Sequence, residues 1–536
     1  MFPSGGAAAA VSRARIALRD LIVRRPSQLW PWLLPVAVFE VIHHYQGHLQ
    51  KPFELLFAVP FVVLVARHPY KSLSVLLVLL PFNTFILAVL FRLGLPASVV
   101  WAIGFWKEGV LAGLVAAAVF RTQRSRTLGV KRRLDAVDKL VGAYVLLGTA
   151  YLFVPELFIH GAVGAHLGFY LRELGWRTDV LYFALLLVGK HLVLNLDQVH
   201  RLLRKVVAVG VVLSLGGIYE FFFTNSWLRF ILVTLRLRSF DIEVLKFPKP
   251  SVQENYATLG ARHFPRVSSF LLFDYLSFGF LLIICLGIAL ELVVRGEHKR
   301  WFLAGLPLIA LGILLNQGRA AIIGAILTTI FALRVPLGRS VIHRVRLTMA
   351  VAMVFVIAIP LSLVTGLDHR FVSSNSSNSG HSSATSSGLH VMATNPLGRG
   401  LGTGAGAGQA AVQKGQITSS TFLVSEDQLL QIGTQLGYLG VGLYGISLGV
   451  ILYRLARRRP DPLHSGYGGP AAGLANGLVG LTVAIFVLQP FVVNAVDWTF
   501  FLLAGTALGL LDRTAQLEPA RRVDRPALVS LEGKWN

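Results

Sequence analysis

The chain has 536 residues, of which 54% are hydrophobic and 14% are charged, and its mean hydropathy is +0.65. Soluble proteins carry about 25% charged residues, so this composition excludes one large soluble globule, whose surface it could not cover with polar groups. The only cysteine, Cys285, lies in an apolar run, which excludes a disulfide framework and a cysteine metal site. The net charge of +24 would fit a nucleic-acid-binding protein unless its placement has another explanation.

Apolar runs follow one another along most of the chain. A run of about 20 residues can cross a bilayer as a helix, because a helix satisfies its own backbone polar groups. The sequence predicts roughly 14 such spans, and hence an all-α polytopic membrane protein. In chain order, the predicted spans are 28–45, 53–66, 72–92, 98–120, 137–158, 177–195, 205–223, 268–294, 301–316, 319–334, 347–366, 428–453, 472–494 and 497–512. The break between 301–316 and 319–334 is very short, so these two spans form either a tight hairpin or one broken helix.

Lysine and arginine residues cluster on one side of the predicted spans. The clusters lie at 13–25, 121–133, 201–205, 295–300, 334–346 and 454–459 and in the C-terminal tail. Because cytoplasmic segments carry an excess of these residues, both termini are predicted to be cytoplasmic. The predicted organisation is an N-terminal segment 1–27, a transmembrane domain 28–512 and a tail 513–536. The cytoplasmic position of these clusters therefore explains most of the net charge of +24, and no nucleic acid is expected as a partner.

Two long loops, 224–267 and 367–427, are predicted on the outer face. The first is basic, against the usual bias, which indicates an anionic partner on that face. Part of it, SWLRFILVTLRLRSF, alternates apolar and basic residues and is expected to lie in the membrane interface. The second loop is rich in serine and glycine, and its NPLG stretch at 395–398 predicts a turn. The following GRGLGTGAGAG has no strand before it, so a nucleotide-binding loop is not predicted.

Arg319 and Arg266 each stand at the predicted outer start of a helix. A helix N-terminus carries partial positive charge and free N–H groups, so an added guanidinium makes a site for phosphate. Two such arginines could hold a pyrophosphate at the membrane surface through paired hydrogen bonds. The alternative is that each side chain extends to the lipid headgroups without binding a ligand.

Four segments in the second half of the chain resemble, in the same order, segments of the O-antigen ligase and polymerase family. That family consists of bacterial membrane enzymes that transfer glycans from polyprenyl diphosphate. The segments are RVSSFLLFDYLSFGFLL, NQGRAAIIGAIL, SGHSSATSSGLHVMATNPLGRGLGTGAG and SEDQLLQIGTQLGYLGVGLYG. The chain has Glu426-Asp427 where the ligases commonly show His-Asn, and in this it looks more like polymerases of exopolysaccharides.

The resemblance implies a membrane glycosyltransferase with a GT-C-like fold in the bacterial inner membrane and an active site outside the cytoplasm. Its donor would be an undecaprenyl-diphosphate-linked oligosaccharide, and its acceptor would be a glycan or a lipid. The protein would also contact membrane lipids. The resemblance also implies a chain-length regulator or a flippase as protein partner. No cofactor and no metal are expected, since no cluster of His, Asp and Glu has the spacing of metal ligands.

Glycan transfer from a diphosphate requires stabilisation of the departing negative charge and removal of a proton from the acceptor hydroxyl. Arg266 and Arg319 suit the first role. Glu426, Asp427 or His381 suits the second, as general base. Glu426 is favoured because it directly precedes a helix at the membrane rim, where partial burial would raise its pKa toward neutrality. The loop residues expected to contact substrate are Asn395, Gly398, Arg399 and Gly400.

Other interpretations stay open at this point. Glu426 and Asp427 can instead be acids that complement a helix dipole, with Ser425 as the cap. His381 can be merely solvated in a polar loop. A ligase of the same family, which moves glycan to a lipid or protein acceptor, is one alternative function. A transporter or flippase of lipid-linked oligosaccharide is another, although it would be expected to show internal repeats, and the sequence has no convincing one.

Overall fold

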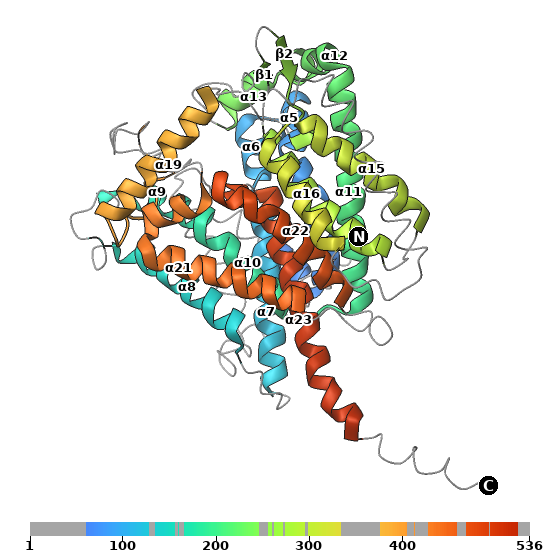
Figure 1. Ribbon diagram of the computed structural model, residues 1–536, viewed down its shortest axis with the longest axis vertical. Helices are drawn as coiled ribbons and strands as arrows, with labels where there is room; N and C mark the ends of the chain where they lie inside the picture. Colours follow the sequence, from blue (N-terminus) through green and yellow to red (C-terminus); the bar gives the residue numbers. More distant parts are fainter. Residues whose placement is uncertain are drawn as a thin grey trace, which may run out of the picture. The chain divides into compact units, whose positions relative to one another are not determined.

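Helices make up nearly all of the part of the chain that the computed structural model describes (Figure 1). The described residues are 60–127, 134–155, 159, 166–245, 256–259, 262–271, 274–294, 299–333, 376–404, 412, 427–457, 468–492 and 494–523. The elements before residue 200 are α4 (Pro69–Leu79), η2 (Leu80–Phe82), α5 (Asn83–Arg92), α6 (Ala97–Ile103), α7 (Trp106–Thr127), α8 (Ala136–Phe153), α9 (Phe169–Trp176), η5 (Arg177–Leu181), α10 (Tyr182–His191) and α11 (Leu196–Phe222). Those after it are α12 (Thr224–Arg229), η6 (Phe230–Thr234), α13 (Leu237–Glu243), β1 (Tyr256–Leu259), β2 (Arg262–Pro265), η8 (Ser269–Leu271), α14 (Tyr275–Val294), α15 (Lys299–Asn316), α16 (Arg319–Leu333), α19 (Ser376–Thr394), α21 (Gln428–Arg457), α22 (Gly468–Val487), η9 (Pro490–Val492) and α23 (Asn494–Val523).

Eight of the described helical segments are long and apolar enough to cross a membrane, which confirms a polytopic helical protein. They are Pro69–Arg92, Ala97–Gln123, Ala136–Phe153, Leu196–Phe222, Tyr275–Val293, Gln428–Arg457, Gly469–Phe486 and Ala495–Arg513. Two shorter apolar helices, Ala304–Asn316 and Arg319–Leu333, accompany them. The predicted spans 28–45 and 347–366 lie outside the described residues, as does the first half of 53–66.

The structure shows the helix geometry in two regions where hydropathy alone does not predict it. The predicted span 177–195 belongs to a helical run from Phe169 to His191 that passes through the π-helical turn η5. The short break after α15 contains Gln317, whose left-handed φ of 57° ends one helix and redirects the next. α15 then packs against α11 and α16 against α22, so these helices diverge instead of pairing as a hairpin along their length.

The chain divides into two compact units, one formed by Met1–Leu73 with Phe105–Arg132 and one by Ser74–Gly104 with Arg133–Asn536. In the smaller unit, a described helix at 60–67 packs on α7, where glycines of α7 face Phe61 and Val65. The larger unit contains every residue that the sequence predicts for the functional site.

The core of the larger unit is built around α14 and α23. α14 and the Ala495–Arg513 part of α23 are buried along almost their whole length. α14 packs against α11, α15, α16 and α22, while α10 packs against α23. Along α14 the residue numbers rise from Ile284 to Ile288, while their contacts on α22 fall from Gly477 to Gly473. These two helices are therefore antiparallel.

Two ends of the larger unit follow from these directions. One end contains the starts of α14, α16 and α21 and the end of α22. A hydrogen bond from the Gln428 N–H to Leu488 O, at 3.1 Å, joins the start of α21 to the residue that follows α22. We name this the arginine end, because Arg266 precedes α14 and Arg319 begins α16. At the other end, which we name the Lys190 end, lie the start of α8 and the ends of α10 and α21.

Gly480 of α22 is expected to tolerate no side chain. A Cβ there would overlap Thr328 Oγ1 and would lie 2.6 Å from the carbonyl oxygen of Gly324, a backbone atom that cannot rotate away. We expect Gly480→Ala to lower the free energy of unfolding by about 1–3 kcal/mol, as overpacking does. Thermal unfolding in detergent measures this, with Gly442→Ala as control, because a Cβ at Gly442 meets no atom within 4 Å. Equal stability of the two variants would contradict the close packing.

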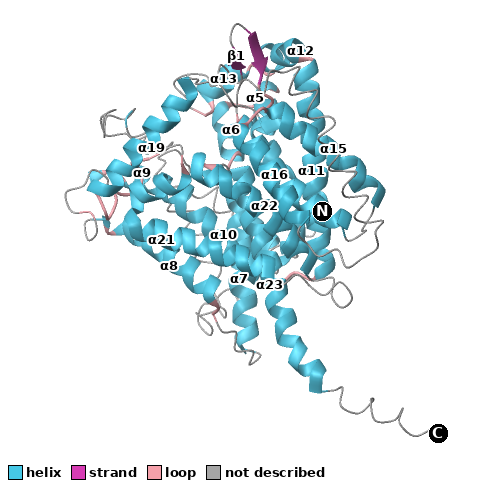
Figure 2. Cartoon of the chain, in the orientation of Figure 1, coloured by secondary structure: helices cyan, strands magenta, loops and turns pink. Residues whose placement is uncertain are grey.

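The predicted outer loop 224–267 has more structure than the sequence indicates. Its segment 226–240, expected to lie in the membrane interface, forms α12, η6 and α13. Trp227, Ile231 and Phe240 are buried against residues of α5 and α6, so these side chains serve protein packing, whereas Leu232 and Val233 are exposed. The position of the segment in the membrane interface stays a prediction for its exposed face. Figure 2 shows the short β1–β2 ribbon, which lies in the same loop and was not predicted.

The second predicted loop, 367–427, also contains a helix. α19 covers Ser376–Thr394, so His381 lies in a helix and the prediction of a polar loop around it is wrong. Serine and glycine are poor helix formers, yet Val391 and Met392 of α19 are buried against α21. This packing stabilises the helix where local preference opposes it.

Candidate functional site at the arginine end

A buried asparagine joins the two arginine-bearing segments. Asn316, the last residue of α15, donates from Nδ2 to Val267 O at 3.0 Å and to Tyr275 O at 2.6 Å. Its Oδ1 accepts the N–H of Gly318 at 3.2 Å. The segment that follows Arg266 and the turn that precedes Arg319 are therefore held against each other, as the sequence-based hypothesis of a shared site requires.

The two arginines are presented differently. The Arg266 guanidinium lies over the Tyr275 ring, with 4.7 Å between its Cζ and the ring centroid. Its Nε is buried and has no hydrogen-bond partner among the described residues. Stacking on a ring orients the guanidinium plane and leaves its edge available for an anion. Arg319 is half-buried at the first position of α16, where helix N–H groups have no intrahelical partner.

A buried glutamate anchors the chain immediately after Arg266. Glu220, near the end of α11, accepts the N–H groups of Ser268 at 3.0 Å and Ser269 at 2.7 Å through Oε2. Ser269 has a left-handed φ of 54°, and its hydroxyl donates to Leu213 O at 2.5 Å. The chain beside Arg266 is thus tied to α11 as well as to Asn316, which limits how far its backbone can move.

Asp427 caps α21 at the same end. Its Oδ1 accepts the N–H of Leu429 at 2.8 Å and of Leu430 at 3.2 Å. Burial raises the pKa of the Asp427 carboxyl, while these two hydrogen bonds act in the opposite direction. Asp427 therefore performs the capping role considered for Ser425, and Glu426 and Ser425 lie outside the described residues. The side chain of His381 is likewise not described, so its proposed role stays a prediction.

Replacement of Asp427 separates capping from catalysis. Asp427→Ala is expected to lower the free energy of unfolding by about 1 kcal/mol, whereas Asp427→Asn keeps a good cap and nearly full stability. Chemical or thermal unfolding in detergent measures both. If Asp427 is the general base, Asp427→Asn abolishes transfer at normal stability; if it only caps the helix, transfer persists. Equal destabilisation by both substitutions would show that the cap is not what matters at this position.

The predicted glycine-rich turn docks into a break in α21. Gly437 has non-helical torsions, with φ of 68° and ψ of −169°, so the helix opens there. The Tyr438 N–H, which would donate to Thr434 O in an unbroken helix, donates to Pro396 O at 3.0 Å. Thr434 O accepts the N–H of Arg399 at 2.7 Å instead. The loop thus satisfies backbone groups that the break leaves without helical partners, as a membrane interior requires.

The predicted substrate-loop residues are brought together by this docking. The Gly398 N–H donates to Asn395 O at 2.8 Å, which confirms the predicted turn, and Gly398 has a left-handed φ of 82°. The Gly400 N–H donates to a backbone oxygen of α21 at 3.0 Å. Tyr151, near the end of α8, donates its hydroxyl to Leu397 O at 2.7 Å. The loop therefore lies at the arginine end, between α8 and α21.

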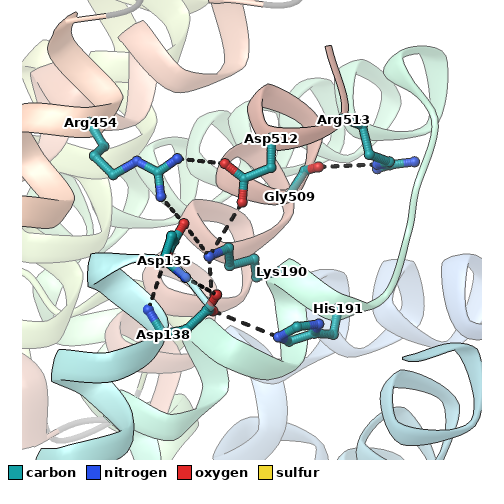
Figure 3. Close-up of polar contacts among 8 residues, drawn as sticks. All are labelled: Asp135, Asp138, Lys190, His191, Arg454, Gly509, Asp512 and Arg513. Carbon is teal, nitrogen blue, oxygen red and sulfur yellow. Dashed lines mark hydrogen bonds and ion pairs between the residues drawn. The ribbon is translucent and has the colours of Figure 1, made fainter. Parts of the chain in front are cut away.

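The opposite end of the larger unit holds a buried charge cluster (Figure 3). Lys190 is fully buried, and its Nζ lies 2.6 Å from Asp135, 2.8 Å from Asp138 and 3.3 Å from Asp512. Arg454 pairs with Asp135 and Asp512. Burial alone would raise the pKa of Asp135. The hydrogen bonds from Lys190 and from a backbone N–H lower that pKa by more than burial raises it, so its net shift is downward. This cluster joins α8, α10, α21 and α23 away from the arginine end, and we expect it to contribute to stability.

Several residues at these sites escaped the sequence reasoning. Asn316, Glu220, Asp179, Gln431 and Gln435 are buried polar residues within or beside apolar runs. Each of these residues is a polar residue in or beside a predicted apolar span. That contrast is the only feature of the sequence that could have indicated a functional role for them. Within the described residues, no group of three or more His, Cys, Asp or Glu side chains is placed to hold a metal ion.

Comparison with known proteins gives no family assignment. No model of a protein family matches the chain, and no curated protein resembles it significantly.

Proposed function

We propose that the chain is a membrane glycosyltransferase of the O-antigen ligase and polymerase type, which extends a surface polysaccharide. It transfers glycan from an undecaprenyl-diphosphate-linked donor to an acceptor hydroxyl at the arginine end. The observation that carries the proposal is the bonding of Asn316 to Val267 and Tyr275, at 3.0 and 2.6 Å. It holds the segments of Arg266 and Arg319 together, which a shared diphosphate site requires.

The proposed reaction uses two arginines and one general base. The acceptor oxygen attacks the anomeric carbon of the donor glycan and forms the new glycosidic bond. The bond between that carbon and the diphosphate oxygen breaks, and the lipid diphosphate leaves with the electron pair. Arg266 and Arg319 stabilise the leaving charge. Glu426 takes the acceptor proton, with Asp427 and His381 as the other candidate bases.

The proposal includes an orientation in the membrane. Two basic clusters of the sequence, 201–205 and 454–459, lie close to the start of α11 and the end of α21. Both of these helix termini are at the Lys190 end. The positive-inside rule then makes the Lys190 end cytoplasmic and the arginine end extracytoplasmic. The full proposal is a GT-C-like protein of the bacterial inner membrane with roughly 14 spans and both termini in the cytoplasm.

The test is a reconstitution with a defined donor. Purified protein in liposomes receives an undecaprenyl-diphosphate-linked oligosaccharide, with and without EDTA, and the products are separated by length. Longer lipid-linked glycans support the polymerase, and glycan on a different lipid or protein supports the ligase. Movement of intact donor across the bilayer with no bond change would overturn the enzyme proposal in favour of a flippase. Because the proposed chemistry uses no metal, EDTA is expected to leave the rate unchanged.

A further inference from the structure

A buried carboxylate outside the proposed diphosphate site links three parts of the fold. Asp179 lies in the π-helical turn η5 and is almost fully buried. Gln431 Nε2 donates to its Oδ1 at 2.6 Å, and Gln435 Nε2 donates to its Oδ2 at 2.7 Å. The two glutamines stand one helical turn apart and so share one face of α21. An ionisable side chain inside a membrane domain is costly and is a functional-site hypothesis by default.

The donors and acceptors of this network are fixed by a backbone group. The Gly402 N–H can only donate, and it lies 2.9 Å from the side-chain amide of Gln435. The amide atom that faces Gly402 is therefore the oxygen, and the atom that faces Asp179 is the NH₂ group. Asp179 must then accept, which a carboxylate oxygen does. The chain of bonds thus runs in one direction, from residues 395–404, which we name the glycine loop, through Gln435 to Asp179.

Gln435 holds the glycine loop at two points. Its backbone oxygen accepts the N–H of Gly400 at 3.0 Å, and its side-chain oxygen accepts that of Gly402. Gly402 has a left-handed φ of 86°, and a Cβ there would overlap the backbone oxygen of Leu171 in α9. The loop is therefore clamped between α9 and α21, and Arg399 lies within the clamped segment, with its N–H bonded to Thr434 O of α21 at 2.7 Å.

We propose that Asp179 is a positioning residue, which acts through Gln435 to hold the glycine loop, and with it Arg399, in the geometry that binds the lipid-linked glycan. The glycan-binding part of this proposal rests on the proposed function. The positioning part does not, because the loop is held whether or not a reaction takes place. Loss of both accepting oxygens at Asp179 releases the Gln435 amide, whereas one remaining oxygen can still accept it, because the Gln431 Oε1 has no hydrogen-bond partner among the described residues and can turn to accept a donor.

The test uses a reciprocal exchange of acceptor and donor. Asp179→Leu keeps a similar side-chain shape but removes both acceptors, and Gln435→Glu places two carboxylates face to face. The double variant combines Gln435→Glu with Asp179→Asn, so that the amide at position 179 donates to the carboxylate at position 435, which still accepts the Gly402 N–H. Each single variant is expected to speed amide hydrogen exchange in the 395–404 peptide by about tenfold or more, and the double variant is expected to restore protection. Hydrogen–deuterium exchange of the full-length protein in detergent measures this.

Asp241→Asn is the matched control. Asp241 is also a fully buried aspartate of the larger unit, but it lies in α13, which packs against α5 and η6. Its substitution is expected to leave exchange in the 395–404 peptide at the wild-type level. If Asp179→Leu leaves this exchange unchanged, or if Asp241→Asn accelerates it equally, Asp179 does not position the loop. If Asp179→Leu does not yield monodisperse protein, recovery of folding and protection in the double variant decides for the proposal, and failure of that variant decides against it.

Transfer kinetics then connect the loop to the proposed reaction. kcat/KM for the lipid-linked donor is expected to fall about tenfold or more in the single variants and to recover in the double variant. If the double variant restores protection of the loop from exchange but neither it nor the wild-type protein transfers glycan, the proposed function is refuted and the positioning role of Asp179 stands. Normal kcat/KM in a variant with an unprotected loop would refute the role of the loop in glycan binding.

Discussion

Arg319→Ala and Arg266→Ala are each expected to lower the rate of glycan transfer by about 10²–10³-fold, the loss typical of one donor to a developing negative charge. Both side chains stand where the chain is held by Asn316, and the Arg266 guanidinium is already oriented by the Tyr275 ring. A preoriented cation stabilises the departing diphosphate without reorganisation in the transition state. The measurement is the single-turnover rate with a lipid-linked oligosaccharide donor.

Conservative variants and a matched arginine sharpen this prediction. Arg266→Lys and Arg319→Lys keep the charge but lose the planar fork, so partial activity is expected from each. Arg92→Ala is the control: Arg92 is an exposed arginine whose Nε donates to Thr234 O at 2.6 Å, and it has no place in the proposed site. Transfer is expected to be unaffected by it. If both alanine variants at 266 and 319 turn over like wild type, neither arginine binds the diphosphate.

Lys190→Met is expected to lower the free energy of unfolding by about 3–5 kcal/mol, the usual effect of removing one partner from a buried ion pair. The substitution leaves Asp135, Asp138 and Asp512 close together at the Lys190 end. Arg454 still pairs with Asp135 and Asp512, and His191 lies 3.7 Å from Asp138. Methionine has a similar volume, so the loss reports charge rather than a cavity. Thermal or denaturant unfolding in detergent measures the difference.

The pH dependence of that difference tests its origin. The pKa of Asp135 is lowered in the folded protein, chiefly because the hydrogen bond and charge of Lys190 outweigh the opposing effect of burial. A lowered folded pKa contributes stability above the unfolded pKa and loses it as pH falls through the folded value. The gap between wild type and Lys190→Met is therefore expected to narrow below about pH 4. Lys205→Met is the control, since Lys205 lies outside the Lys190 cluster and donates to the uncharged hydroxyl of Ser74 at 2.5 Å. A pH-independent gap, or an equal loss in the control, would contradict the cluster's electrostatic role.

Local sequence predicted the helix ends better than the loops. The sequence predicts acids at the start of a helix, and Asp427 caps α21. It predicts a polar loop around His381, because serine and glycine are poor helix formers, yet α19 forms against α21 through Val391 and Met392. The sequence shows no protein partner for the apolar residues of segment 226–240, yet Trp227 and Phe240 pack against α5 and α6. In both cases the deciding contact comes from a distant element.

The sequence by itself determined the class of this protein, most of its described spans and the position of Arg319 at the start of α16. These follow from the length of apolar runs and from the positions of charges, which are local properties of a chain that must satisfy its backbone groups within a bilayer. The prediction that Arg266 stands at a helix start is wrong, because η8 lies between it and the first residue of α14, Tyr275.

Only the tertiary structure decided which polar groups meet. Asp179 bonds to Gln431 and Gln435 across 252 and 256 residues of sequence, and Asn316 bonds to Val267 across 49. Such pairings depend on the direction and rotation of packed helices, and no run of neighbouring residues encodes either.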